Sequence, residues 1–267
     1  MISAAIVGIV VGILSGLLGI GGGTVMVPVF RLLFGMEPIM ATATSFFTII
    51  PTSLAGMWKH IRNRTCLLKL GLIAGIAGAC MSPVGVWCAN VSPGWLIMIA
   101  AACVILYSAF TMLKKAIAAG KPRKDAASRS GAPLVSDDVA PLSARQVALG
   151  AAIGLAAGFL GGFVGVGGGF IMVPLFISLL GVSMRLASGT SLIAVLLIAI
   201  PGTIEQGILG NISYTAGLAM AVGSMPGAVL GANLVKYVPE RALRFGFAGF
   251  LAVVAVILVL NEFGVLG

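Results

Sequence analysis

The sequence GVGGGFIMVP at residues 165–174 is one of two copies of a motif that interrupts long apolar runs. The other copy, GIGGGTVMVP, stands 146 positions earlier, at residues 19–28. Each glycine costs about 1 kcal/mol relative to alanine inside a helix, so three in succession predict a break in helical structure. Within a bilayer, non-helical backbone persists only where protein or a water-filled cavity surrounds it. We therefore expect the two related breaks to form a site between two halves of the chain.

Composition identifies the chain as an integral membrane protein. Of its 267 residues, 60% are hydrophobic and 9% are charged, whereas soluble domains carry about 25% charged residues. Residues 70–113 and 146–184 contain no Asp, Glu, Lys or Arg, and each is long enough for two spans of roughly 20 residues. The apolar amino terminus has no positively charged start, which favours a first membrane helix over a cleaved signal peptide.

A repeat relates the two halves of the chain. Residues 21–45 and 167–191 are identical at 12 of 25 positions when they are aligned at the 146-residue offset. We expect five membrane segments in each half, an odd number that gives the two halves opposite orientations. In the first half the expected segments are residues 3–18, 24–35, 39–58, 70–90 and 94–113. In the second half they are residues 146–164, 170–180, 184–204, 213–235 and 245–261.

The predicted fold class is an all-α polytopic membrane protein built from two inverted-topology repeats, with a short broken helix after each glycine break. The short elements 24–35 and 170–180 are at most about 18 Å long, less than the roughly 30 Å of a hydrocarbon core. Whether they cross the membrane or re-enter it stays open. We expect three parts: a first membrane repeat at 1–114, a flexible linker at 115–144 and a second membrane repeat at 145–267.

The formal net charge of +9 is explained by topology rather than by a nucleic-acid partner. Basic residues cluster in 59–69, 115–144 and 236–244, between apolar spans, and such loops face the cytoplasm. The pattern places the linker 115–144 in the cytoplasm and both termini outside. The counterpart of 59–69 in the second half, residues 205–212, contains no Lys or Arg, which favours repeats of opposite orientation.

The glycine breaks are the first candidate binding site. Exposed backbone N–H groups, followed by the start of a helix, attract anions without any charged side chain. The alternative is that the glycines only let two helices cross closely. The candidate substrate-binding glycines are Gly21, Gly22, Gly23, Gly167, Gly168 and Gly169.

Side chains near the breaks supply further candidates. The hydroxyl pairs Thr44–Ser45 and Thr190–Ser191 can donate hydrogen bonds to an oxyanion, although such hydroxyls also bond helix carbonyls four residues back. Glu205 is the candidate for proton coupling, because it is a carboxylate at the inner edge of a long apolar segment. The alternative for Glu205 is a solvated residue at the membrane interface.

The sequence argues against an enzyme. His60 is the only histidine, and the four cysteines form no C-x-x-C pair. We therefore predict no metal site, no disulfide and no cofactor. The chain also lacks a G-x-S-x-G motif, so no catalytic residues are assigned.

The paired motifs resemble those of the TauE/SafE family of membrane transporters, also called the sulfite exporter or toluene-sulfonate uptake permease family. The resemblance is carried by Gly19–Pro28 with Ala41–Ser45 and by Gly165–Pro174 with Ala187–Ser191. It implies secondary transport of small sulfur-containing or organic anions, such as sulfite, sulfonates or sulfoacetate, often as export driven by an ion gradient.

Taken together, the residues and the resemblance predict a secondary transporter that exports a small anion across the bacterial inner membrane by alternating access. Its expected partners are the anion, the lipid bilayer and a coupling ion, either a proton or sodium. A passive anion channel is the alternative, since it would share the paired breaks. The identity of the anion, the direction of transport, the coupling ion and the oligomeric state are left open by the sequence.

Overall fold

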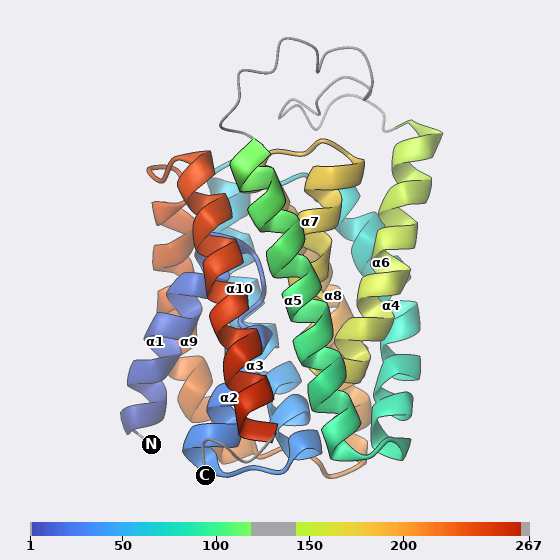
Figure 1. The fold of residues 1–267 in the computed structure, drawn as a ribbon, viewed down its shortest axis with the longest axis vertical. Coiled ribbons are helices and arrows are strands. Elements are labelled where there is room, and N and C mark those ends of the chain that lie inside the picture. The colour runs from blue at the N-terminus through green and yellow to red at the C-terminus, as the bar shows by residue number, and fades with distance from the viewer. Residues whose placement is uncertain (1, 119–142, 263–267) are drawn as a thin grey trace.

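The computed structural model describes residues 2–118 and 143–262, and throughout these residues the regular structure is helical (Figure 1). The first half contains α1 (Ile2–Leu18), α2 (Gly23–Phe34), α3 (Pro38–Arg62), α4 (Leu68–Val91) and α5 (Gly94–Ala118). The second half contains α6 (Ala144–Val164), α7 (Gly169–Leu179), α8 (Met184–Ile208), α9 (Tyr214–Leu234) and α10 (Glu240–Glu262). The all-α class predicted from sequence is confirmed for the described residues.

Several of these helices have the length and composition of membrane spans. Within the described ranges, six are long and apolar enough to cross a bilayer: α3, α4, α5, α6, α8 and α9. The protein is therefore a multi-pass membrane protein, as its composition predicts.

Local capping residues fix where several helices begin. Pro38 occupies the first turn of α3, where its missing N–H is not needed. The side chain of Ser183 accepts a hydrogen bond from the Leu186 N–H and caps α8. Ser143 and Gln146 form a reciprocal capping box at the start of α6.

Each glycine break turns the chain back on itself. α1 runs from one end of the molecule to its middle, and α2 returns to the same end (Figure 1). α6 and α7 form a similar hairpin that opens towards the opposite end (Figure 1). With 12 and 11 residues, α2 and α7 reach about 18 and 16 Å, well short of a roughly 30 Å core. By length, neither of these two helices can cross such a core on its own.

The first helix of each hairpin packs on the other half of the chain. α1 lies against α9, and α6 lies against α4. A Cβ on Gly12 would lie 2.2 Å from the Ser224 carbonyl oxygen, and one on Gly158 would lie 2.1 Å from the Gly78 carbonyl oxygen. Gly12 and Gly158 each belong to a series of glycines spaced four residues apart. Because these distances leave no room for a side chain, such glycines serve close helix packing.

α3 and α8 occupy the centre of the molecule. α4 packs on α8, α9 packs on α3, and α5 and α10 pack against each other. Of the six candidate spans, α8 and α3 are the most buried, at 67% and 61% of their apolar windows. The two central helices are thus in position to contact both glycine breaks.

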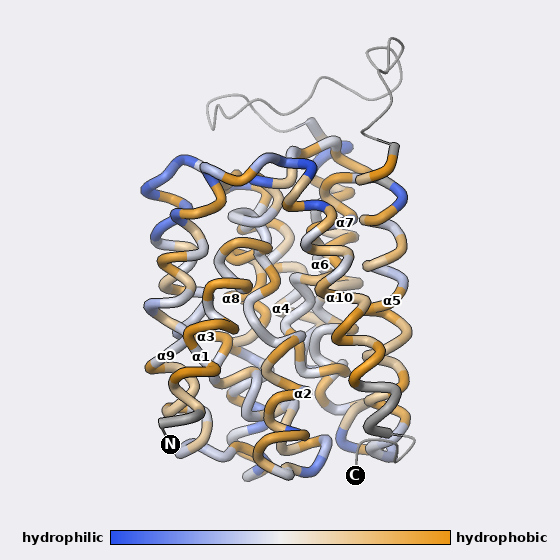
Figure 2. The backbone as a smooth tube through the Cα atoms, turned by 60° about the vertical axis from the view of Figure 1, so that its left-hand side comes forward, coloured by the Kyte–Doolittle hydropathy of each residue, from blue (hydrophilic) through white to orange (hydrophobic). Residues whose placement is uncertain are grey.

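Charged residues gather at the ends of the helices and are unevenly divided between them. Figure 2 shows hydrophilic stretches at both ends and apolar helices between them. The end at which α3, α5 and α9 finish carries the basic residues Lys59, Arg62, Arg64, Lys69, Lys114, Arg145, Arg185, Lys236, Arg241 and Arg244 (Figure 1). The opposite end carries Arg31, Glu37 and Glu205. The described parts of the predicted basic segments therefore lie at one end of the molecule.

Several predicted boundaries are wrong by a few residues. α3 continues to Arg62, inside the predicted loop 59–69, and α10 already begins at Glu240, inside the predicted turn 236–244. α5 likewise continues to Ala118, inside the predicted linker. The sequence prediction ends helices where charge begins, but Lys, Arg and Glu are good helix formers at a membrane surface. Residues 119–142 of the predicted linker lie outside the described residues.

Candidate functional site

The two glycine breaks have the same backbone conformation. Three glycines in each have positive φ, which a residue with a Cβ rarely adopts. The values are 75°, 72° and 86° at Gly19, Gly21 and Gly22, and 78°, 73° and 77° at Gly165, Gly167 and Gly168. The breaks therefore require glycine at these positions for conformational reasons.

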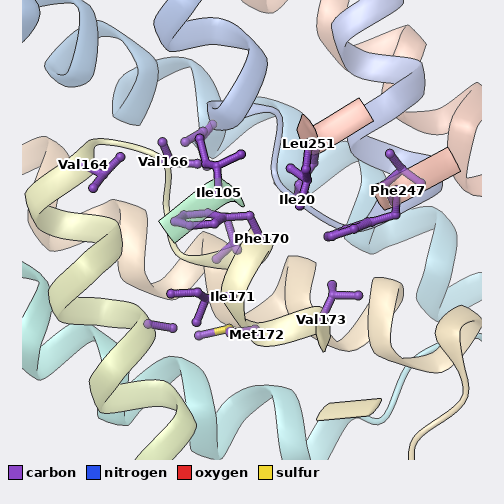
Figure 3. Packing of buried hydrophobic residues seen from close by; sticks show 14 of the residues in the cluster. Ile20, Ile105, Val164, Val166, Phe170, Ile171, Met172, Val173, Phe247 and Leu251 are labelled. Atoms are coloured by element: carbon purple, nitrogen blue, oxygen red, sulfur yellow. The ribbon is translucent and has the colours of Figure 1, made fainter. Parts of the chain in front are cut away.

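The two breaks also contact each other. A Cβ on Gly23 would lie 2.7 Å from the Cα of Val166, and one on Gly169 would lie 2.9 Å from the Gly19 carbonyl oxygen. Figure 3 shows Val166 within the buried apolar cluster that surrounds this contact. The fold thus brings together the two sets of glycines that the sequence predicts as one site.

One residue from each central helix packs against both breaks. Ile49 of α3 and Val195 of α8 are fully buried and are separated by the 146-residue offset of the repeat. A Cβ on Gly21 would lie 2.5 Å from Val195 Cγ1, and one on Gly23 would lie 2.7 Å from Ile49 Cδ1. The breaks are therefore packed shut in this conformation, and an ion would reach them only after helices move apart.

Two helix N-termini meet at the closed centre, because α2 and α7 both begin at a break. Their N-cap residues, Gly22 and Gly168, provide no side-chain cap. The first N–H groups of a helix have no partner within it and carry a partial positive charge. Such termini bind anions, so the arrangement offers anion recognition without a cationic side chain.

Thr44 and Thr190 hold the starts of other helices. The Thr44 hydroxyl accepts a hydrogen bond from the Ser213 N–H at 3.0 Å, next to the start of α9. The Thr190 hydroxyl accepts one from the Leu67 N–H at 2.9 Å, next to the start of α4. These two predicted site residues therefore face α9 and α4, while each hydroxyl keeps a hydrogen to donate.

Ser45 and Ser191 lie on the helix faces that meet the breaks. Ser191 Oγ donates to the Gly19 carbonyl oxygen at 2.5 Å and also lies 2.9 Å from the Ser188 carbonyl oxygen. Ser45 precedes Ile49 by four residues, so the two share a face of α3. Its hydroxyl is buried and, in the described part of the chain, has no hydrogen-bond partner.

Glu205 does not lie at the breaks. It follows Val195 by ten residues on α8, which is about 15 Å along the helix. Its Oε2 atom is buried and has no hydrogen-bond partner among the described residues. The structure therefore separates the predicted proton-coupling residue from the predicted anion site.

Sequence reasoning missed three hydroxyl residues beside the first break. Ser15, Thr24 and Ser53 are fully buried, and within the described residues their hydroxyls have no hydrogen-bond partner. Ser53 follows Ile49 by four residues, so the periodicity of α3 could have indicated it. Ser15 and Thr24 gave no comparable signal, because single Ser and Thr residues are ordinary in membrane helices.

Sequence reasoning also did not identify His60 as a residue that contacts the first hairpin. Its Nε2 donates to the Gly16 carbonyl oxygen at 2.8 Å, and its Nδ1 lies 2.8 Å from the Thr65 hydroxyl. The residue at the same repeat position, Gln206, accepts a hydrogen bond from the Asn211 side chain at 2.7 Å. Both halves therefore use a buried polar residue to fix the turn after a central helix.

Helices that break at mid-depth, with their N-termini meeting between two halves of a multi-pass membrane protein, are typical of secondary transporters. A family model described as "Sulfite exporter TauE/SafE" matches residues 4–258 of the chain. The chain belongs to this family of membrane transporters, which confirms the resemblance seen in its motifs.

Related proteins are also named as transporters. The "Probable membrane transporter protein YunE" of Bacillus subtilis is 28% identical over 251 residues, which cover 89% of each chain. A "Probable membrane transporter protein" of Haemophilus influenzae is 31% identical over 277 residues, covering 94% of this chain and 95% of its own. No solved structure matches this chain.

Proposed function

We propose that this protein is a secondary transporter that exports a small anion, such as sulfite or a sulfonate, across the bacterial inner membrane. The observation that carries the proposal is the meeting of two uncapped helix N-termini, at Gly22 and Gly168, in the buried centre. An anion bound there would accept hydrogen bonds from backbone N–H groups in a medium of low dielectric, where such bonds are strong.

The substrate site comprises the glycines of both breaks together with the nearby hydroxyls. Gly21–Gly23 and Gly167–Gly169 supply backbone N–H groups, and Ser45 and Ser191 lie on the helix faces that meet them. Thr44 and Thr190 are assigned to the same site through the hydrogen that each hydroxyl can still donate.

Transport proceeds by alternating access between two repeats of inverted topology. Support comes from hairpins that open towards opposite ends of the molecule and from contacts that recur at the 146-residue offset (Figure 1). Because Ile49 and Val195 close the centre, movement of one repeat against the other would open it to one side at a time.

The charge distribution orients the molecule in the membrane. The end that carries Lys59, Arg62 and Lys236 faces the cytoplasm, because basic residues are retained on that side. The linker 115–144 and residues 236–244 then lie in the cytoplasm, and the start of α1 lies outside.

Coupling is assigned to a proton carried by Glu205, with sodium as the competing ion. Support comes from the partly buried carboxylate, whose Oε2 has no hydrogen-bond partner in the described part of the chain. Glu205→Gln should abolish the dependence of export on a pH gradient while leaving anion binding intact. If export by the parent protein depended on a sodium gradient instead, sodium would be the coupling ion.

The test of the anion site compares two glycines with nearly equal backbone strain. Gly167 has a φ of 73° at the break, and Gly181 has a φ of 68° in a turn where an added Cβ meets nothing within 4 Å. Gly167→Ala should reduce anion transport in proteoliposomes by at least about 10-fold. Gly181→Ala should carry a similar strain but retain transport. Equal transport by the two variants would contradict the proposed site.

A further inference from the structure

The two breaks share a backbone conformation but differ in the hydroxyls around them. Each hydroxyl residue beside the first break can be compared with the residue 146 positions later. Ser15 corresponds to Gly161, Thr24 to Phe170 and Ser53 to Ala199. The second break therefore has apolar residues where the first has hydroxyls.

The hydroxyls beside the first break are buried without partners. Ser15, Thr24 and Ser53 are all 0% exposed, and their oxygens have no hydrogen-bond partner in the ranges that the structure describes. A buried hydroxyl without a partner is unfavourable and uncommon. Three of them around one break indicate a missing polar partner.

These hydroxyl residues lie beside the start of α2. A Cβ on Gly21 would lie 3.2 Å from Ser53 Oγ, and one on Gly22 would lie 3.5 Å from the Cβ of Ser15. Thr24 lies in the first turn of α2, as the second residue of that helix. The unpartnered hydroxyls thus surround a helix terminus whose N–H groups attract negative charge.

The second break has no equivalent set. Phe170 lies with Ile105 and Val166 in the buried apolar cluster (Figure 3). Ser191 lies at the first break instead, where it donates to the Gly19 carbonyl oxygen. This side of the centre therefore offers packing surface rather than hydrogen-bond donors.

We propose that the substrate binds asymmetrically, with the oxygens of a small oxyanion held at the first break by the hydroxyls of Ser15 and Ser53 and the N-terminus of α2. Thr24 completes this half-site. The second break forms an apolar wall, through Ala199 and Phe170, against the rest of the ligand. This inference rests on the proposed function and deepens it, because it selects oxyanions with an apolar side, such as organic sulfonates.

The test measures the Kd of methanesulfonate for the full-length protein in detergent by isothermal titration. Ser53→Ala and Ser15→Ala should each weaken binding by about 10-fold or more, since a hydrogen bond to a charged ligand is lost. Their thermal stability without ligand should not fall, because neither hydroxyl has a partner. Ser82→Ala is the matched control, because Ser82 is equally buried and unpartnered but lies on α4, beside Gly202. The Kd of methanesulfonate for this variant should stay within about 2-fold of the Kd for the parent protein.

The possible results distinguish a failure of the asymmetric site from a failure of the proposed transport function. Binding that is unchanged in Ser53→Ala and Ser15→Ala overturns the asymmetric site but leaves an anion transporter. Equal weakening in all three variants also overturns it, because the effect would then be one of general packing. If neither sulfite nor methanesulfonate binds the parent protein, the proposed function itself fails.

Discussion

Ser191 of α8 donates a hydrogen bond to the carbonyl oxygen of Gly19, at a distance of 2.5 Å. Gly19 follows the last residue of α1, where carbonyl groups have no partner within the helix. A central helix of the second half therefore holds the break of the first half. The matching serine, Ser45, makes no such bond in the described part of the chain.

Ser191→Ala should lower the free energy of unfolding by about 1 kcal/mol, because it leaves the buried Gly19 carbonyl without its donor. The measurement is the apparent Tm of the purified protein in a fixed detergent. Ser45→Ala is the control and should change the Tm little, since no bond is lost. Equal losses in the two variants would contradict the assigned hydrogen bond.

Alanine at the packing glycines should destabilise the hairpins. Gly12→Ala and Gly158→Ala place a Cβ within 2.2 Å and 2.1 Å of the carbonyl oxygens of Ser224 and Gly78. We expect each to cost about 1–3 kcal/mol, as overpacking does. Gly249→Ala in α10, where an added Cβ meets nothing within 4 Å, should instead stabilise by up to about 1 kcal/mol. Thermal unfolding of the three variants in one detergent measures these changes in stability. A Gly12→Ala variant as stable as the parent protein would contradict the close packing of Gly12 against Ser224.

Arg64 should be replaceable by glycine with a gain in stability. It has a φ of 53° in the turn after α3, and the residue at the same repeat position, Gly210, has a φ of 73°. A left-handed conformation destabilises a residue with a Cβ by about 1–2 kcal/mol. Glycine avoids this strain, but part of the gain is lost because glycine increases the conformational entropy of the unfolded chain. Arg64→Gly should thus raise the apparent Tm, and Gly210→Ala should lower it. A lower Tm for Arg64→Gly would show that its side chain makes a contact worth more than the strain.

Glu240 should make stability depend on pH in the acid range. Burial alone raises its pKa, but hydrogen bonds from the Met184 N–H and the Arg244 guanidinium, with the charges of Arg244 and Arg185, hold the pKa below its ordinary value. A lowered pKa in the folded state stabilises the protein above the unfolded value of about 4.3 and ceases to do so as pH falls through the folded value.

Glu240→Gln should therefore destabilise by about 1 kcal/mol at pH 7, mainly through the weakened cap of α8. The difference from the parent protein should shrink below about pH 4.3. Thermal unfolding of both proteins between pH 3 and pH 7 measures it. A difference that stays constant across this range would mean that the carboxylate charge does not contribute.

Much of the fold could be predicted because a few residues constrain the backbone strongly. Three consecutive glycines cannot continue a membrane helix, and both breaks were identified from them. The start of α3 at Pro38 is predictable for a similar local reason, because proline is favoured in the first turn of a helix. The pairing of α1 with α9 was not predicted, because the contact between Gly12 and Ser224 joins distant parts of the chain and leaves no local signal.

The candidate site was only partly predictable, because neighbours in sequence separate in space. Thr44 and Ser45 are adjacent, but a helix turns about 100° per residue, so one faces α9 and the other the breaks. Ser15 and Ser53 lie far apart in the sequence and meet only when the first break folds between them. Their importance follows from burial without a partner, which only the structure reveals.

The most direct test of anion transport by alternating access is counterflow of labelled sulfite in proteoliposomes. Vesicles are loaded with unlabelled sulfite at high concentration and diluted into a trace of labelled sulfite, with ionophores present to collapse ion gradients. We predict transient accumulation of label above equilibrium, saturating with sulfite concentration and reduced in Gly167→Ala but not in Gly181→Ala. A label that only equilibrates, without overshoot or saturation, would contradict this mechanism and indicate a passive anion channel.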